Sequence, residues 1–159
     1  MDFIAPNAPA ETNASKAFDL LKMRCGSGDV TTAVTDRRDI GKFVARIIAD
    51  DRTLNQYVFC WGEERSQKEI IALAERVAGK PIPTKQFPAE QVKAIASVQA
   101  PGSLEQSYFQ YFYSLFVRGD NTIQNAKREE YGSALDAKEL YPDLEPRSLE
   151  DFANDFYAQ

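Results

Sequence analysis

The segment from Leu104 to Val117, LEQSYFQYFYSLFV, constrains the fold of this chain more than any other. Ser103 with Gln106 has the spacing of a helix-capping pair and predicts a helix here. One face of that helix carries tyrosine and leucine side chains, and the other carries three phenylalanines and a tyrosine. A helix that is apolar on most sides must be buried nearly all round. Core, a partner subunit or a ligand must therefore cover it.

The chain is long enough to bury such a helix in a single domain. It has 159 residues, of which 43% are hydrophobic and 11% aromatic, and a chain of this length usually forms one domain. Residues 1–15 combine prolines, asparagines and small polar residues, which predicts a flexible N-terminal arm. We therefore expect one folded domain over residues 16–159.

The remaining pattern predicts an α+β fold, with a small sheet of about three short strands packed with five or six helices. β-Branched and aromatic runs predict strands over residues 30–35, 56–61 and 84–87. Ile40, Phe43, Val44, Ile47 and Ile48 have the spacing of an amphipathic helix. Further helices are predicted after Ser66, after Pro88 and after Ser148.

Composition excludes several classes of function. The net charge is −5 and no basic run is present, which argues against nucleic-acid binding. No apolar run approaches the roughly 20 residues that span a bilayer, and the N-terminus has no signal-peptide pattern. These features predict a cytoplasmic protein that does not insert in a membrane.

The reactive residue types narrow the chemistry further. Cys25 and Cys60 are too few for a disulfide framework and too isolated for a zinc site, so we expect two reduced thiols and no metal. The chain contains no histidine. Any catalysis must therefore use Asp, Glu, Tyr, Arg, Lys or Cys side chains.

Six short motifs in order resemble the C-terminal portion of the NmrA-like and isoflavone-reductase-like family, of the fungal type. They are Gly26 to Asp29, Asp36 to Gly41, Asp50 to Tyr57, Trp61 to Glu63, Leu140 to Asp143 and Arg147 to Glu150. The likeness runs from about Gly26 to the C-terminus, and in the family this portion forms the smaller substrate domain.

The resemblance leads to predictions about the cofactor, the substrate and the oligomeric state. The family normally opens with a glycine-rich dinucleotide loop, and no Gly-x-Gly-x-x-Gly motif occurs in this sequence. We therefore expect no cofactor, and a bulky aromatic small molecule as substrate. The surface that faces the dinucleotide domain in the family is apolar, so we also expect a homodimer.

Arg38 is a candidate catalytic residue at the start of the helix after the first predicted strand. Its guanidinium is suited to hold a carbonyl or a developing oxyanion, with Asp36 or Asp39 orienting it. The alternative is that an aspartate caps the helix and the arginines form ordinary ion pairs.

The aromatic segment supplies further candidates. Tyr108 and Tyr113 are candidate proton donors, and Tyr111 and Phe112 are candidate substrate contacts, together with Trp61 at a strand end. For each of these residues, an ordinary place in the core is the alternative interpretation.

Glu129 and Glu130 lie in a polar segment and are the candidate acidic residues. In a site without histidine, Glu130 would act as general acid or base and Glu129 would bind substrate. The alternative is a solvated charged turn.

These features together favour a cofactor-independent isomerase or cyclase acting on an aromatic natural-product intermediate in fungal secondary metabolism, for example by a semipinacol-type rearrangement. Two alternatives stay open. One is a non-catalytic binding or regulatory module, and the other is a truncated substrate domain of an NAD(P)H-dependent reductase.

Overall fold

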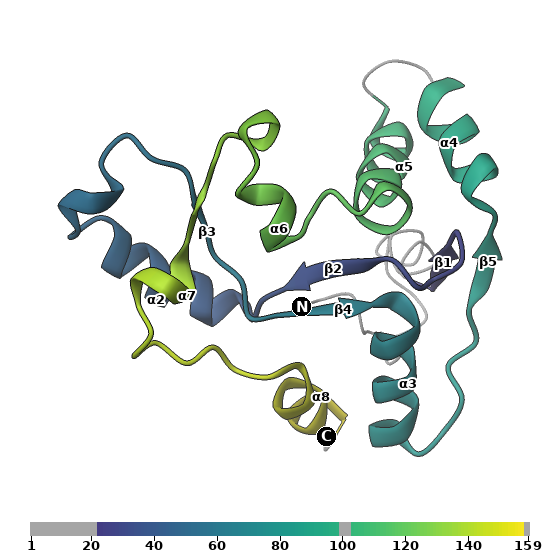
Figure 1. Cartoon of the computed structure of the whole chain (residues 1–159). Coiled ribbons are helices and arrows are strands. Elements are labelled where there is room, and N and C mark those ends of the chain that lie inside the picture. The colour runs from purple at the N-terminus through teal and green to yellow at the C-terminus, as the bar shows by residue number, and fades with distance from the viewer. Residues whose placement is uncertain (1–21, 99–102, 158–159) are drawn as a thin grey trace. The chain divides into compact units, whose positions relative to one another are not determined.

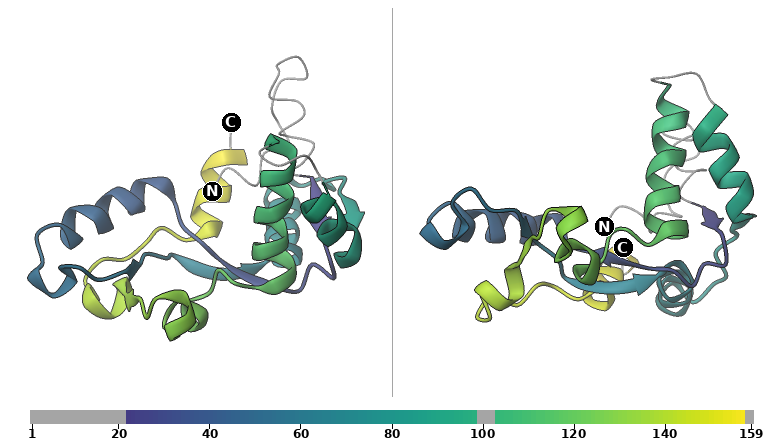
Figure 2. Two further views of the ribbon diagram at one scale, coloured as in Figure 1. Left: turned by 90° about the horizontal axis from the view of Figure 1, so that it is seen from above. Right: turned by 45° about the horizontal axis from the view of Figure 1, so that its top comes forward.

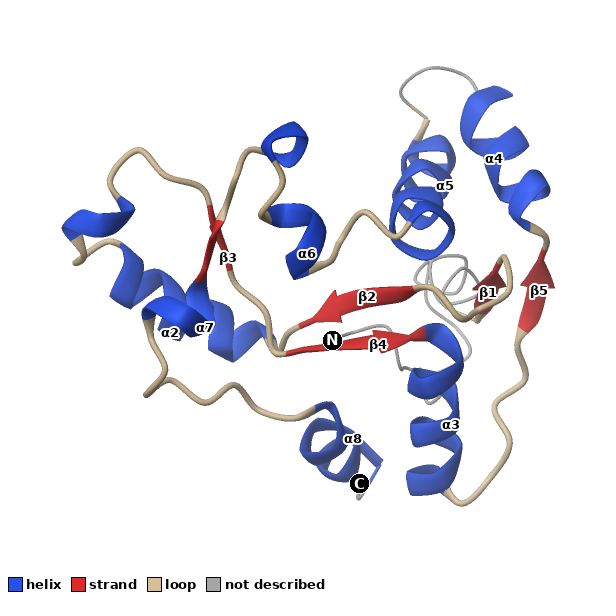
Figure 3. Ribbon diagram, viewed as in Figure 1, coloured by secondary structure: helices blue, strands red, loops and turns tan. Residues whose placement is uncertain are grey.

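A computed structural model describes residues 22–98 and 103–157 (Figures 1 and 3). Helices and short strands alternate along this part of the chain, which confirms the α+β class. The strands form three two-stranded pairs, β1–β5, β2–β4 and β3–β6, where one small sheet was expected. The predicted arm over residues 1–15 lies outside the described residues.

The described residues group into two compact units, each built from separate stretches of chain. The first, here named the α2 unit, holds residues 32–65 and 120–157. The second, named the α5 unit, holds residues 22–31, 66–98 and 103–119. Each unit is described by itself.

The α2 unit takes its name from helix α2 (Arg37–Ile47). Its other elements are β2 (Thr31–Val34), η1 (Asp51–Thr53), β3 (Val58–Phe59), β4 (Glu63–Ser66), α6 (Ile123–Ala126), η3 (Glu129–Tyr131), β6 (Leu135–Asp136), α7 (Ala137–Leu140) and α8 (Leu149–Tyr157). β3 and β6 are parallel, with Val58 opposite Leu135.

The core of the α2 unit forms around Phe43, Ala137 and Tyr141, which are almost fully buried. The Tyr141 hydroxyl donates a 3.0 Å hydrogen bond to Asp50, so this buried phenol is satisfied. The core therefore joins one side of α2 to α7 and to the segment after it.

α2 confirms the predicted helix but buries less of it than the apolar pattern suggests. Phe43 is fully buried, whereas Ile40, Val44 and Ile48 are 44%, 46% and 80% exposed. The five apolar positions span a wide arc of the helix, and the core covers only one side of that arc.

The α5 unit contains β1 (Met23–Cys25), α3 (Gln67–Ala78), β5 (Lys85–Phe87), α4 (Ala89–Val98), α5 (Leu104–Tyr113) and a π-helical turn, η2 (Ser114–Arg118). β1 and β5 are parallel, with Met23 opposite Lys85 and Cys25 opposite Phe87. β5 confirms the strand expected near residues 84–87.

Gln67 satisfies the edge of β1 that β5 leaves unpaired. Its side-chain oxygen accepts from the Cys25 N–H at 2.8 Å, and its amide nitrogen donates to the Met23 carbonyl at 3.1 Å. Gln67 is itself 8% exposed. One side-chain amide thus stands in for a neighbouring strand, since buried backbone groups need partners.

Three predicted helix starts are confirmed. Ser66 and Glu69 form a reciprocal capping box at the start of α3, and Gly79 ends that helix with a φ of 64°. Ser103 accepts from the Gln106 N–H at the start of α5. Ser148 accepts from the Asp151 N–H at the start of α8.

The aromatic segment forms α5 and η2 and packs on α4, which lies beside it (Figure 2). Phe109 and Phe112 are each 3% exposed. They belong to a core whose buried members are Met23, Cys25, Val92, Ala96, Phe109, Phe112, Leu115 and Phe116. Core, a partner subunit and a ligand were the three possible coverings for this segment. In the α5 unit, the hydrophobic core covers it.

Candidate functional site

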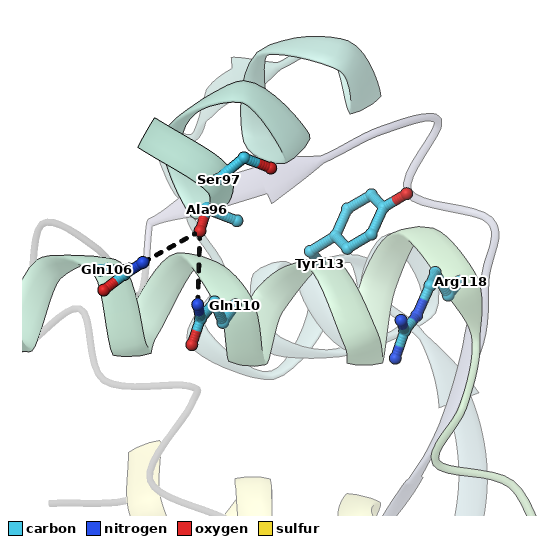
Figure 4. A pocket seen from close by; sticks show the side chains of 6 residues that line it. All are labelled: Ala96, Ser97, Gln106, Gln110, Tyr113 and Arg118. Carbon is cyan, nitrogen blue, oxygen red and sulfur yellow. Dashed lines mark hydrogen bonds between the residues drawn. The ribbon is translucent and has the colours of Figure 1, made fainter. Parts of the chain in front are cut away.

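A pocket of about 380 Å³ opens where α4, α5 and η2 meet in the α5 unit (Figure 4). Its lining residues are Ala96, Ser97, Gln106, Gln110, Tyr113 and Arg118. Its volume lies within the range of small-molecule sites, about 300–1,000 Å³, but it is open to solvent and its lining is mostly polar.

The wall between α4 and α5 is held by hydrogen bonds to one carbonyl. Ala96 lies in the last turn of α4, where backbone carbonyls have no partner within the helix. Its oxygen accepts from the Gln106 and Gln110 side-chain amides at 3.5 and 3.4 Å. These two glutamines therefore fasten the end of α4 to the side of α5.

The π turn places Tyr113 and Arg118 together. In an α-helix, residues five apart point about 140° away from each other. A π turn forms i→i+5 hydrogen bonds and is wider than an α turn, so such residues come closer to the same side of the helix. The Arg118 guanidinium carbon lies 5.6 Å from the centre of the Tyr113 ring, a cation–π distance. A phenol and a cation thus line the same pocket.

Tyr113 is the only candidate from the sequence that lines this pocket. Phe112 lies in the core, and Tyr108 packs against that core with its ring 6.3 Å from the Phe112 ring. Tyr111 is 50% exposed. α5 therefore gives its four candidates different surroundings, because a helix turns about 100° with each residue.

Arg38 and Asp36 are brought together in the α2 unit. The Asp36 carboxylate accepts from the Arg38 backbone N–H at 2.9 Å and so caps α2. It also accepts from the Arg38 guanidinium at 3.1 and 2.7 Å. These bonds to Arg38 hold the pKa of Asp36 well below its usual range, although burial opposes the shift. This geometry agrees with the alternative interpretation of Asp36, in which the aspartate caps the helix and the arginine forms an ordinary ion pair with it.

Asp39 and Arg147 extend the same network. Asp39 is 1% exposed and accepts from the Arg147 backbone N–H at 2.7 Å and from the Lys42 ammonium at 2.6 Å. The Arg147 guanidinium reaches Asp36 at 3.4 Å and the Asp151 carbonyl at 2.7 Å. Arg147 thus ties the segment before α8 to the start of α2.

Trp61 is held by two residues that sequence reasoning missed. Its indole N–H donates to Asp136 at 2.9 Å, and the Lys138 ammonium lies 3.9 Å from the centre of its ring. Asp136 also caps α7 by accepting from the Lys138 N–H. Local sequence holds no signal for this cluster, because Trp61 and Asp136 are 75 positions apart.

Glu129 and Glu130 lie in η3 and are exposed to solvent. Glu130 pairs with Arg128 at 2.5 Å, with both side chains more than half exposed. This geometry agrees with the alternative interpretation of Glu129 and Glu130 as part of a solvated charged turn.

The candidate residues therefore divide between the units. Asp36, Arg38, Trp61, Glu129 and Glu130 belong to the α2 unit, and the four candidates on α5 belong to the α5 unit.

Two further findings concern the part of the chain that the structure describes. Residues 22–98 and 103–157 contain no cluster of three acidic, cysteine or histidine side chains arranged to hold a metal ion. No helix in these ranges is long and apolar enough to cross a membrane.

Comparison with known proteins gives consistent results. The model of the NmrA-like family matches residues 4–153. The chain is 33% identical over 139 residues to asnovolin J 5′,6′-dehydrogenase of Aspergillus novofumigatus, covering 80% of this chain and 41% of that protein. It is 32% identical over 134 residues to a phenylcoumaran benzylic ether reductase of Ginkgo biloba, covering 82% and 42%.

Solved structures show the same fold. Leucoanthocyanidin reductase of Vitis vinifera, in its binary complex with NADPH, superposes with a TM-score of 0.72 at 19% identity, over 86% of this chain and 46% of that one. A crystal structure of isoflavone reductase gives a TM-score of 0.69 at 22% identity, over 97% and 47%. The chain thus spans about two fifths of the length of the curated relatives it matches.

Proposed function

Because the chain belongs to the NmrA-like family, we propose that it holds a bulky, oxygen-bearing aromatic small molecule for conversion in secondary metabolism. The observation that carries the proposal is the pocket between α4 and α5, where Tyr113 and Arg118 lie together. A phenol ring stacks on aromatic ligands and donates a hydrogen bond at its edge. A guanidinium binds carbonyl, phenolate or carboxylate oxygens.

The proposed reaction is a redox-neutral isomerisation or cyclisation that needs no cofactor. Such a reaction takes up a proton at one atom of the substrate and releases one at another, and it requires no hydride donor. The Tyr113 hydroxyl would donate a proton to a substrate oxygen, and Arg118 would stabilise the Tyr113 phenolate that this leaves. The phenolate would then take up the proton that the substrate releases at its other atom, which restores the phenol. The roles expected for Arg38, Tyr108 and Glu130 stay predictions.

A second candidate function is the substrate-binding part of a nicotinamide-dependent reductase. The observation in its favour is that the relatives are named as a dehydrogenase and a reductase, and that the chain spans about two fifths of their length. The pocket residues would then orient a substrate for hydride transfer. A third candidate, a regulatory module, would bind the ligand without converting it.

One assay separates these functions. The purified chain is incubated with oxygenated polycyclic aromatics, with and without NADPH, and the molecular masses of the products are measured by mass spectrometry. A product of unchanged mass formed without NADPH supports the isomerase. A product that gains two hydrogens only with NADPH supports the reductase, and binding without conversion supports the module.

A binding measurement tests the pocket itself. Quercetin serves as the fluorescent probe, with Tyr113→Leu and Arg118→Met as variants. Tyr111→Leu is the matched control, because Tyr111 lies on the same helix but does not line the pocket. We expect weaker binding in the two pocket variants alone. Equal binding by all four proteins would contradict a role for this pocket.

A homodimer and a cytoplasmic location also belong to the proposal. The two unpaired thiols agree with a reducing compartment. Light scattering on the purified chain and imaging of a fluorescent fusion are the direct measurements.

A further inference from the structure

The pocket between α4 and α5 contains two polar side chains that are already bound to backbone carbonyls. They are Ser97 on α4 and Gln110 on α5. A carbonyl oxygen can only accept hydrogen bonds, so each side chain must use a donor hydrogen for this bond. The atoms that these bonds leave over determine what the two residues can offer a ligand.

Ser97 is left with an acceptor. Its hydroxyl donates to the Lys93 carbonyl at 2.8 Å, one turn earlier in α4. A hydroxyl has a single hydrogen, so in this position the Ser97 oxygen can only accept a hydrogen bond from a ligand. Ser97 is exposed and lines the pocket. The oxygen is therefore accessible to a ligand there.

Gln110 also presents an acceptor. Its amide nitrogen faces the Ala96 carbonyl at 3.4 Å (Figure 4). This bond determines the orientation of the amide, because the reverse orientation would place two oxygens against each other. The oxygen of the Gln110 amide therefore points away from Ala96. Along α5, Gln110 lies between Gln106 and Tyr113 (Figure 4).

Tyr113 and Arg118 bring donors to the same pocket. The phenol can donate its hydroxyl hydrogen, and a guanidinium has five N–H groups and no acceptor. Both residues lie beyond Gln110, at the end of α5 and in η2 (Figure 4). The pocket thus combines acceptors from α4 and the middle of α5 with donors from the end of the helix.

We propose that the ligand of this pocket is a hydroxylated aromatic carbonyl compound. Its hydroxyl group donates to Ser97 and Gln110, and its carbonyl oxygen accepts from Tyr113. A methyl ether at the same place has no hydrogen to donate, so it leaves the two acceptors unpaired, and a site that binds a hydroxyl group selects against such an analogue. Ser97 and Gln110 are therefore specificity-determining residues. The inference rests on the ligand pocket of the proposed function, whichever reaction follows.

Three acetonaphthones test the proposal by titration calorimetry of the full chain. They carry a hydroxyl group, a methoxyl group or only hydrogen on the ring opposite the acetyl group. The hydrogen probe is smaller than the hydroxyl probe, so size does not explain weaker binding of the hydrogen probe. Because the pocket is open to solvent, we expect the gain of one ordinary hydrogen bond, which is roughly fivefold tighter binding of the hydroxyl probe.

A double variant, Ser97→Ala with Gln110→Leu, should bind the hydroxyl and hydrogen probes equally. Ser107→Ala with Gln91→Leu is the matched control, because these two residues are exposed on the same two helices and do not line the pocket. Ser107 also donates to the carbonyl one turn before it, at 3.2 Å. The probes are compared on one protein, so a general loss of folding weakens both and does not imitate a loss of selectivity.

Each outcome has a separate meaning. Selectivity for the hydroxyl probe that the double variant loses and the control keeps supports the proposal. Selectivity that the double variant retains overturns the roles of Ser97 and Gln110. Binding that Tyr113→Leu weakens, but that does not favour the hydroxyl probe, keeps the proposed pocket and overturns the ligand class. Absence of binding by all three probes overturns both.

Discussion

Replacing Gln67 with leucine should destabilise the α5 unit, because it removes both hydrogen bonds at the outer edge of β1. The Cys25 N–H and the Met23 carbonyl would lose partners that now lie at 2.8 and 3.1 Å. The other edge of the strand is occupied by β5, which accepts from Gly26 and donates to Lys22. Neither group could therefore find a new partner without moving the strand.

The size of the effect follows from these two groups. A buried polar group left without a partner costs about 1–3 kcal/mol, so two of them cost about 4 kcal/mol. Burying a leucine side chain offsets about 2 kcal/mol of this. We expect Gln67→Leu to lower the free energy of unfolding by about 2 kcal/mol. For a chain of this length that shift lowers Tm by about 4–8 °C.

Urea denaturation followed by circular dichroism measures the change, with Gln91→Leu as the matched control. Gln91 lies on α4 in the same unit and is exposed, so its substitution should stay within about 0.5 kcal/mol. Hydrogen exchange at the Cys25 amide supplies a local measurement and should become faster in Gln67→Leu. Equal stability of the two variants would refute the idea that Gln67 substitutes for a strand.

Three further predictions concern other parts of the molecule. Since bonds from Arg38 lower the pKa of Asp36 in the folded state, this carboxylate stabilises the fold above about pH 4 and the contribution is lost as pH falls further; acid unfolding should be less steep in Asp36→Asn than in the wild type, and equal slopes would contradict this. Burial raises the pKa of the Cys25 thiol to about 11, so Ellman's reagent should modify the partly buried Cys60 first in native protein and both thiols at once in denaturant; faster labelling of Cys25, identified by peptide mapping, would disprove the assignment. Asp136→Ala removes the Trp61 indole bond and the cap of α7, so it should cost about 1–2 kcal/mol and shift the emission of the single tryptophan, whereas unchanged fluorescence would argue against the contact.

The helix boundaries were predictable because their hydrogen bonds are local. A serine three residues before a glutamate, glutamine or aspartate encodes the start of α3, α5 and α8 within four positions of sequence. The same holds for the turn at Gly79, where a left-handed residue ends α3. Each of these bonds requires no knowledge of the rest of the fold.

The features that were not predictable depend on distant partners. Gln67 looks like an ordinary first residue of a helix, but its amide pairs with backbone 44 positions away. The apolar period of α2 indicates a helix without saying how much of its arc the core covers. The π turn at residues 114–118 has no propensity signal of its own, because packing around it decides whether a helix widens.

For the candidate site, residue type was predictable and grouping was not. The sequence singles out three tyrosines on the aromatic helix, and of these Tyr113 lines the pocket. Its neighbour Arg118 carries no helix-face signal, because the π turn changes which side of the helix it occupies. Sequence therefore indicates which chemistry is available, and tertiary structure determines which groups share a site.

The interleaving of the two units affects how the chain can be dissected. Each unit contains an insertion that belongs to the other: residues 32–65 interrupt the α5 unit, and residues 66–119 interrupt the α2 unit. A single proteolytic cut or truncation therefore cannot release either unit as one continuous polypeptide. Recombination that exchanges one unit between relatives would need three crossovers, after residues 31, 65 and 119, so the two units are expected to be inherited together.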